Sequence, residues 1–236
     1  MRPITAESKT IVYPDSDGKP MAENTLQYRW IVTIKGGLEV TFLHDPNVFV
    51  AGDLLWYPVE GNPKIRMAPD ALVAFGRPKG ERGSYRLWEE DGIPPQVVFE
   101  VLSPGNRAGE MARKFEFYQR YGVEEYYIYD PDRGTLRGWL RHGRVLEEIP
   151  QMAGFVSPRL GIRFEPGEGP DNLAIYRPDG SRFQSFEETS ERAEAEHRRA
   201  EAERHRAEAE RRNAEAERHR AERYLAKLRE LGIEPD

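Results

Sequence analysis

Short apolar runs bounded by turn residues predict strands, and one amphipathic stretch among them predicts a helix. The apolar runs lie at residues 48–57, 71–75 and 97–103. Residues 108–121 carry apolar side chains at helical spacing, and Gly122 follows them, which favours a helix that ends there. This order predicts a sheet domain with helices on it.

Further strands are predicted after this helix. They are EEYYIYDP, which ends in an Asp-Pro turn, and TLRGWLRHGRVLEEI, which is typical of a hairpin around His142-Gly143. SPRLGIRF and LAIYRPDG predict two more short strands. The central strand–helix–strand order indicates an α/β or α+β domain.

The sequence at the start of the chain does not distinguish a helix from a strand. Residues 21–40 could open as a helix that ends near Gly36-Gly37, although the apolar residues from Ile31 to Ile34 would suit a strand as well. Before them, residues 1–19 predict a flexible or loosely draped segment.

The composition changes once, near residue 186. From there to about residue 231 the chain is almost entirely Glu, Arg, Ala and His, without Pro or Gly. We therefore expect a flexible segment at residues 1–19, a folded domain at residues 20–185 and a helical tail at residues 186–236.

The tail repeats a seven-residue unit close to AEAERHR, in which Glu often precedes Arg by three or four positions and supports a long helix. With Ala at heptad position a, position d is occupied first by Glu196, Glu203, Glu210 and Glu217. We favour a solvated helix of which only the tip can pair, namely Tyr224, Leu228 and Leu231, with a full-length coiled coil as the alternative. The tail histidines share no i, i+4 pair and are not expected to bind metal: His197, His205 and His219.

Composition excludes several classes of protein. With no cysteine, the chain has no disulfide framework, thiolate catalysis or iron–sulfur cluster. No run approaches the roughly 18 consecutive apolar residues of a membrane span, and no apolar leader is evident, so we expect a cytoplasmic protein. A net charge of -6 and a pI of about 5.6 argue against a protein that coats nucleic acid, but they leave room for a local basic cleft.

Two carboxylates interrupt the most apolar segments of the chain. Asp70 lies in the run APDALVAFG, and Glu100 lies in the run PPQVVFEVLSP. A lone ionised carboxylate in an apolar layer costs several kcal/mol unless it is paired, protonated or bound to a metal. If the two lie near each other, they predict a cation site.

Lys114 is the third informative residue. It lies within the apolar stripe of the predicted helix, three positions after Met111 and four before Tyr118. Its stem could extend to solvent, or its ammonium could reach back toward Glu100.

Each of these residues also has a structural interpretation. Alone, Asp70 is better explained as a turn cap and Glu100 as half of a salt bridge. Together with Lys114, they favour a metal site. The basic run GRPKGERGSYR could contact a phosphate backbone, although a solvated loop is the commoner outcome.

From about residue 53 to residue 131 the chain resembles the Uma-type restriction endonuclease family, which belongs to the PD-(D/E)xK nuclease superfamily. The residues that carry the resemblance are the Pro69-Asp70 pair, FEVLSP around Glu100, the spaced Lys114 and Tyr118, and GVEEYYIYDP. The resemblance implies a restriction-endonuclease-like fold, in which a mixed sheet flanked by helices carries Asp70 and Glu100 on neighbouring strands.

The resemblance also implies chemistry. In the superfamily pattern a lysine stands two residues after the acidic residue, but here that position is Leu102. In the Uma-type family the lysine is taken to have moved to the following helix. The resemblance therefore makes Lys114 the candidate. Asp70, Glu100 and the backbone carbonyl of Val101 would hold Mg²⁺, with Mn²⁺ as a substitute, and Lys114 would orient the nucleophilic water.

Three more residues are weaker candidates for this site: Asp53, Tyr118 and Glu23. Asp53 could equally be a surface residue, Tyr118 could be core, and Glu23 depends on the uncertain first helix.

We therefore expect a Mg²⁺-dependent endonuclease that hydrolyses phosphodiester bonds in DNA. Duplex cutting by related folds and the tail tip suggest a homodimer. The alternative is a non-catalytic binding or assembly protein that joins a partner helix through its tail. A metal hydrolase of small phosphate esters would share the same site.

Overall fold

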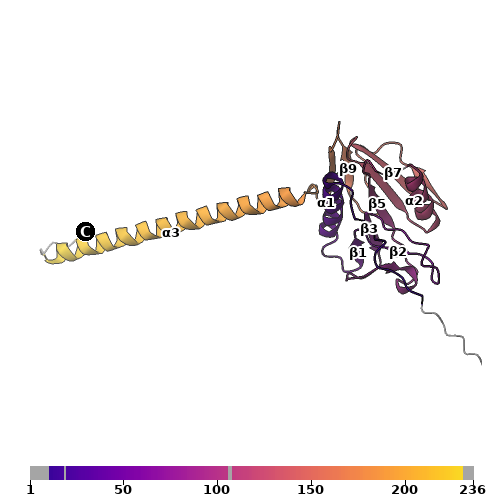
Figure 1. Ribbon diagram of the computed structural model, residues 1–236. Coiled ribbons are helices and arrows are strands. Elements are labelled where there is room, and N and C mark those ends of the chain that lie inside the picture. The colour runs from indigo at the N-terminus through magenta and orange to yellow at the C-terminus, as the bar shows by residue number, and fades with distance from the viewer. Residues whose placement is uncertain (1–10, 19, 106–107, 231–236) are drawn as a thin grey trace, which may run out of the picture. The chain divides into compact units, whose positions relative to one another are not determined.

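The computed structural model describes residues 11–18, 20–105 and 108–230 (Figure 1). By its internal contacts the chain divides into two units, residues 1–185 and residues 186–236, which are described separately here. No helix in the described parts of the chain is long and apolar enough to cross a membrane.

A six-stranded mixed sheet forms the centre of the first unit. Its strands, in sheet order, are β1 (Val48–Ala51), β3 (Ala71–Phe75), β5 (Val97–Val101), β6 (Glu125–Asp130), β7 (Thr135–His142) and β8 (Val145–Glu148). Only β5 and β6 run parallel, and the other neighbours in this sheet are antiparallel. The expected mixed sheet and the hairpin at His142-Gly143 are confirmed, and Gly143 has the positive φ of +62° that this tight turn requires.

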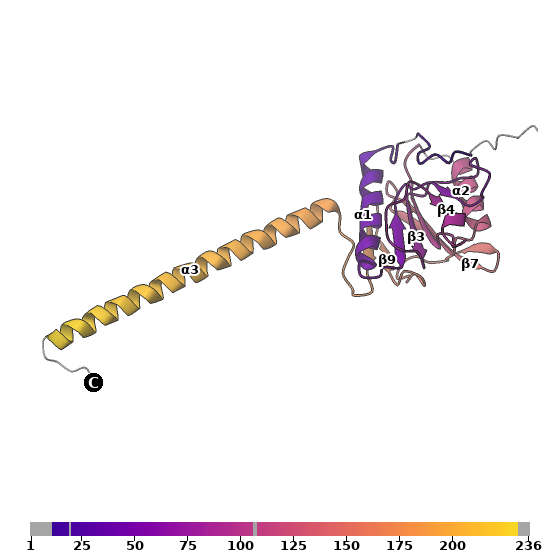
Figure 2. The same ribbon diagram turned by 90° about the horizontal axis from the view of Figure 1, so that it is seen from below.

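Two helices cover opposite faces of the sheet, as Figure 2 shows. Alternation along β5 explains the arrangement, because Val97, Phe99 and Val101 pack with α1 (Thr25–Thr41). Val98 packs on the other face with Tyr118 of α2 (Ala108–Arg120), the helix that connects β5 to the parallel β6. The predicted strand–helix–strand unit is therefore confirmed.

Two small sheets and a short helix complete this unit. They are the parallel pair β2 (Trp56–Tyr57) and β4 (Tyr85–Arg86), the antiparallel pair β9 (Arg163–Pro166) and β10 (Leu173–Tyr176), and the 3₁₀ helix η1 (Leu87–Glu89). The sequence predicted the strands of the second pair but neither β4 nor η1.

The single strand expected at residues 48–57 is wrong, because the chain turns at Gly52-Asp53 and separates β1 from β2. Asp53 has a φ of +50°, and its backbone N–H donates to the carbonyl of Pro69 at 3.1 Å. This turn therefore lies beside the residue that precedes Asp70.

Helix α1 settles the ambiguity at the start of the chain in favour of a helix, so the strand alternative is wrong. Asn24 caps it, because its side-chain oxygen accepts from the N–H of Gln27 at 2.8 Å. The end expected at Gly36-Gly37 is also wrong, because the helix continues to Thr41. A Cβ on Gly37 would lie 2.1 Å from the Phe183 ring, so this glycine serves close packing and not helix termination.

Residues 11–18, which the sequence placed in a flexible segment, contact the domain. The Tyr57 hydroxyl donates to the carbonyl of Pro14 at 2.6 Å, and the N–H of Gly61 donates to the Tyr13 hydroxyl at 2.5 Å. The Tyr13 ring also packs edge-on against Tyr57, with centroids 5.3 Å apart. Residues 1–10 and 19 lie outside the described residues.

The second unit is one helix, α3 (Phe186–Glu230), which has no buried residue. Ion pairs four residues apart lie along it, as between Arg198 and Glu194 at 3.4 Å. Tyr224 at the predicted tip is 73% exposed, and Leu231 lies outside the described residues. The helix is confirmed, whereas the coiled coil and the homodimer stay predictions.

The adjacent glycines of α1 give a matched test of its packing. Gly36→Ala should stabilise the domain by about 1 kcal/mol, because alanine favours helix over glycine and a Cβ there meets nothing within 4 Å. Gly37→Ala should destabilise it by about 1–3 kcal/mol, because the new methyl group collides with Phe183. Urea unfolding of both variants measures the difference, and equal midpoints would contradict the packing of Phe183 on Gly37.

Candidate active site

Asp70 lies beside the end of β5. The next residue, Ala71, opens β3 and pairs with Phe99 of β5. This register brings the Asp70 carboxylate to the N–H of Val101, which donates to its Oδ2 at 2.6 Å. The expectation placed Asp70 and Glu100 on neighbouring strands; Glu100 lies on β5, whereas Asp70 directly precedes the neighbouring strand β3.

Glu100 is buried on the α2 side of β5, with 2% of its side chain exposed. Its Oε2 pairs with the Nζ of Lys114 at 2.6 Å, and its Oε1 accepts from the Tyr118 hydroxyl at 2.5 Å. Lys114 and Tyr118 are four residues apart on α2, so one face of that helix presents both donors to one carboxylate. Lys114 therefore reaches back to Glu100 and does not extend to solvent, since 13% of its side chain is exposed.

The charges of this cluster influence one another strongly. Burial, and next the negative charge of Glu100, raise the pKa of Asp70 well above its ordinary value, although Lys114 and the Val101 N–H oppose the rise. Burial by itself would lower the pKa of Lys114, but the charges of Glu100 and Asp70 outweigh it and raise that pKa. The cluster thus holds a firmly protonated lysine and an aspartate that resists ionisation.

The carbonyl of Val101, an expected metal ligand, has a partner that the sequence analysis missed. The Nε2 of Gln27 on α1 donates to this oxygen at 2.8 Å, and the Oε1 of Gln27 accepts from the N–H of Glu23 at 2.8 Å. Gln27 is a buried amide on the face of α1 that otherwise carries Trp30 and Ile34, and that interruption was the signal that could have identified it.

The two weaker acidic candidates lie near this cluster. Asp53 is exposed, and partial burial, Asp17 and Glu100 raise its pKa while Lys114 lowers it, so it lies within electrostatic reach of the site. Glu23 precedes the cap residue Asn24 and is not on the first helix, contrary to expectation. Its Oε2 accepts from the Ser103 hydroxyl, which places it just after β5.

Tyr126 was not among the expected residues. It is fully buried on β6, and its hydroxyl has no hydrogen-bond partner within the described part of the chain. Burial and then the charges of Glu100 and Asp70 raise its pKa. This hydroxyl is a buried donor beside two carboxylates. A bound water there would accept its hydrogen bond and donate to the carboxylates.

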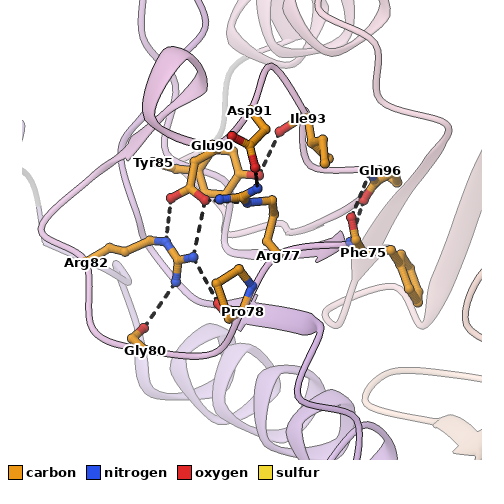
Figure 3. Close-up of polar contacts among 10 residues, drawn as sticks. All are labelled: Phe75, Arg77, Pro78, Gly80, Arg82, Tyr85, Glu90, Asp91, Ile93 and Gln96. Carbon is orange, nitrogen blue, oxygen red and sulfur yellow. Dashed lines mark hydrogen bonds and ion pairs between the residues drawn. The ribbon is translucent and has the colours of Figure 1, made fainter.

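The basic run at residues 76–86 is a largely exposed loop, as the commoner interpretation expected, but its cations have partners within the protein. Arg77 and Arg82 both pair with the buried Glu90, at 2.8 and 2.5 Å, as Figure 3 shows. Lys79 donates to the carbonyls of Phe42 and Leu43. Internal partners engage these cations, so they do not contribute a basic cleft.

Tyr118→Phe tests how much the phenol contributes to the cluster. The variant should lose about 1.5–3 kcal/mol of unfolding free energy, because a hydrogen bond to a buried carboxylate is removed. Tyr121→Phe on the same helix is the control and should change stability by less than about 0.5 kcal/mol, since the described residues give that hydroxyl no hydrogen bond. Equal losses in the two variants would contradict the role of Tyr118.

Asp70→Asn tests whether the unfavourable ionisation of Asp70 lowers the stability of the fold. Because the folded protein raises the pKa of Asp70 above the ordinary 3.8, the native state holds the proton more tightly, and stability falls as pH rises above about 4. The asparagine can still accept from the Val101 N–H but carries no charge. In EDTA the variant should therefore melt above the wild type at pH 8, and the difference should shrink toward pH 4.

The control for this series is Asp132→Asn at an exposed position. Its melting temperature should follow that of the wild type at every pH. A lower melting temperature of Asp70→Asn at pH 8 would show that ionised Asp70 stabilises the fold, contrary to the account above.

The profile of the Uma2 family, described as "Putative restriction endonuclease", matches residues 37–165. Among solved structures, the crystal structure of a "putative nuclease belonging to DUF820" from Anabaena variabilis is similar, with a TM-score of 0.44 and 14% identity over 59% of this chain and 74% of that chain. No curated protein matches. Because the family match spans more than half of the 236 residues, the chain belongs to the Uma2 family.

Proposed function

We propose that this protein is a metal-dependent endonuclease that hydrolyses phosphodiester bonds in DNA. Membership of the Uma2 family supports nuclease function in general. The single observation that carries the finer proposal is the convergence of Asp70, Glu100 and Lys114. These residues come from three separate segments of the chain, yet they form one buried cluster of charges.

The donor set fits a hydrated Mg²⁺. The described residues contain no group of three or more acidic or histidine side chains arranged to hold a metal. Magnesium does not need such a cage, because it keeps several waters and takes one or two carboxylates together with substrate phosphate. Asp70, Glu100 and the Val101 carbonyl would hold the ion, with Mn²⁺ as a substitute. The unpartnered Tyr126 hydroxyl supports bound water at this position.

A bound cation would acidify a coordinated water and offset negative charge on the scissile phosphate. The protein's own groups hold the remaining charges in place. Lys114 has three N–H donors, and its contact with Glu100 leaves others for the attacking water or a phosphate oxygen. Tyr118 fixes the orientation of Glu100, and Gln27 fixes the Val101 carbonyl. Both act as positioning residues.

A non-catalytic binding or assembly protein is the second candidate. Both oxygens of Glu100 and the Val101 carbonyl already have partners within the protein, and Leu102 stands where the superfamily has its lysine. In that case the cluster would only fasten α2 to the sheet, and α3 would join a partner helix. A hydrolase of small phosphate esters would use the same residues as the nuclease, and substrate screening separates it from the first proposal.

Plasmid nicking with Mg²⁺ or Mn²⁺ tests the proposed function. Asp70→Asn, Glu100→Gln and Lys114→Met should each reduce the rate by about 10²-fold or more, because each removes a ligand or donor used in the transition state. Glu124→Gln, just before β6, and Arg113→Met, exposed beside Lys114, are the matched controls and should nick at the wild-type rate.

Circular dichroism establishes that each variant is folded. Nicking that persists in folded Glu100→Gln would contradict the proposed site. A wild type that nicks neither plasmid nor single-stranded DNA with either metal would favour the assembly protein.

A further inference from the structure

A cavity of about 840 Å³ lies near the end of β5 that carries the carboxylate cluster. Its apolar wall includes Leu102, Phe115 and Trp139. Leu102 follows Glu100 by two residues and Phe115 follows Lys114 directly, so the segments that carry the cluster also line the cavity. Its volume lies within the range of about 300–1,000 Å³ that is usual for sites that bind small molecules.

Polar groups also line this cavity. Asp130 and Asp132 supply carboxylate oxygens, and Thr135 supplies a hydroxyl. Arg133 and Arg137 also line the cavity, and their side chains are 81% and 58% exposed. Arg133 pairs with Asp130 at 3.7 Å and Arg137 with Glu148 at 2.8 Å, at the surface of the domain. The cavity therefore combines an aromatic wall, hydrogen-bond acceptors and solvent-accessible cations.

The ring arrangement indicates what the aromatic wall can bind. Arg137 lies over the Trp139 ring, 4.8 Å from its centroid, and Tyr126 stacks on that ring with centroids 5.4 Å apart. Trp139 therefore has little free face. Phe115 meets Trp139 edge-on at 5.7 Å and is only partly buried, so the Phe115 ring and the Arg137 guanidinium plane are the surfaces open for stacking.

We propose that this cavity takes one unpaired nucleotide of the substrate, next to the phosphate held at the carboxylate cluster. This inference rests on the proposed nuclease function and names its substrate class as single-stranded or locally unpaired nucleic acid. An unpaired base has free N–H groups that the carboxylates of Asp130 and Asp132 can accept, a face that Phe115 can stack on and a phosphate that Arg133 can reach.

Duplex DNA fits this cavity less well. Its bases are stacked and their N–H edges are paired, so a base would enter only after extrusion at a cost of a few kcal/mol. An acidic peptide is also disfavoured, because Asp130 and Asp132 would repel it. The mixed lining thus favours a base, which brings donors and an aromatic face without negative charge of its own.

Fluorescence anisotropy in EDTA tests the inference without cleavage. The probes are three labelled oligonucleotides of equal length: a single strand, a duplex, and an abasic strand that keeps the phosphates but lacks the bases. The full chain should bind the single strand about tenfold more tightly than either of the others, because only the single strand has an unpaired base that can stack on an aromatic ring. Equal affinity for the three probes, or no binding of any of them, would overturn the inference.

Neighbouring phenylalanines on α2 provide the matched variants. Phe115→Leu removes the ring that lines the cavity and should lower single-strand affinity about tenfold, toward that of the abasic probe. Phe117→Leu removes a ring that packs against Trp56 away from the cavity and should leave affinity unchanged. If Phe115→Leu does not fold, Ala112→Leu at an exposed helix position narrows the cavity and should act in the same direction.

Different results would contradict the proposed nuclease function and the proposed nucleotide-binding cavity. Single-strand preference that disappears in Phe115→Leu would support the cavity even if no metal permitted nicking. Nicking without any preference among the three probes would support the nuclease and overturn the cavity. A preference that Phe115→Leu and Ala112→Leu leave intact would also overturn it.

Discussion

The buried contact between Glu100, Lys114 and Tyr118 is the constraint on which the arrangement of this domain depends. Glu100 lies at the centre of the sheet on β5, and its two partners come from the helix that connects β5 to β6. An ionised carboxylate that is 2% exposed is tolerated only when it is paired, and breaking such a pair typically costs about 3–5 kcal/mol. The same contact therefore fixes the position of α2, aligns the residues proposed for catalysis, and holds Phe115 at the wall of the neighbouring cavity.

The ion pair of Glu100 with Lys114 does not fully offset the effect of the Glu100 charge on Asp70. Asp70 lies beside the same strand end, and burial together with the charge of Glu100 raises its pKa well above the ordinary value. The fold thus keeps a second carboxyl group, whose ionisation is unfavourable, where a hydrophobic residue would pack more stably, which is typical of sites selected for function at the expense of stability. A divalent cation would relieve this repulsion. The basic loop does not, because Arg77 and Arg82 pair with Glu90.

The features predictable from the sequence were those set by local pattern. Asp70 and Glu100 stood out because each interrupts an apolar run, and Lys114 stood out because it occupies an apolar helix position. Features that depend on distant partners were not predictable. Position 37 is a glycine within a helix because Phe183, far along the chain, packs against it, and the arginines of the basic loop are paired because Glu90 lies against them. Gln27 interrupts an apolar helix face, but its role was missed because its partner, the Val101 carbonyl, lies 74 residues away.

Calorimetric titration of Mg²⁺ and Mn²⁺ in the absence of DNA tests the central claim most directly, namely that Asp70 and Glu100 form a cation site. The account predicts saturable binding to the wild type and to Glu124→Gln, and none to Glu100→Gln or Asp70→Asn. Binding that is unchanged in Glu100→Gln, or no binding to the wild type at all, would contradict it. The Glu100–Lys114–Tyr118 contact would then serve only to hold the domain together.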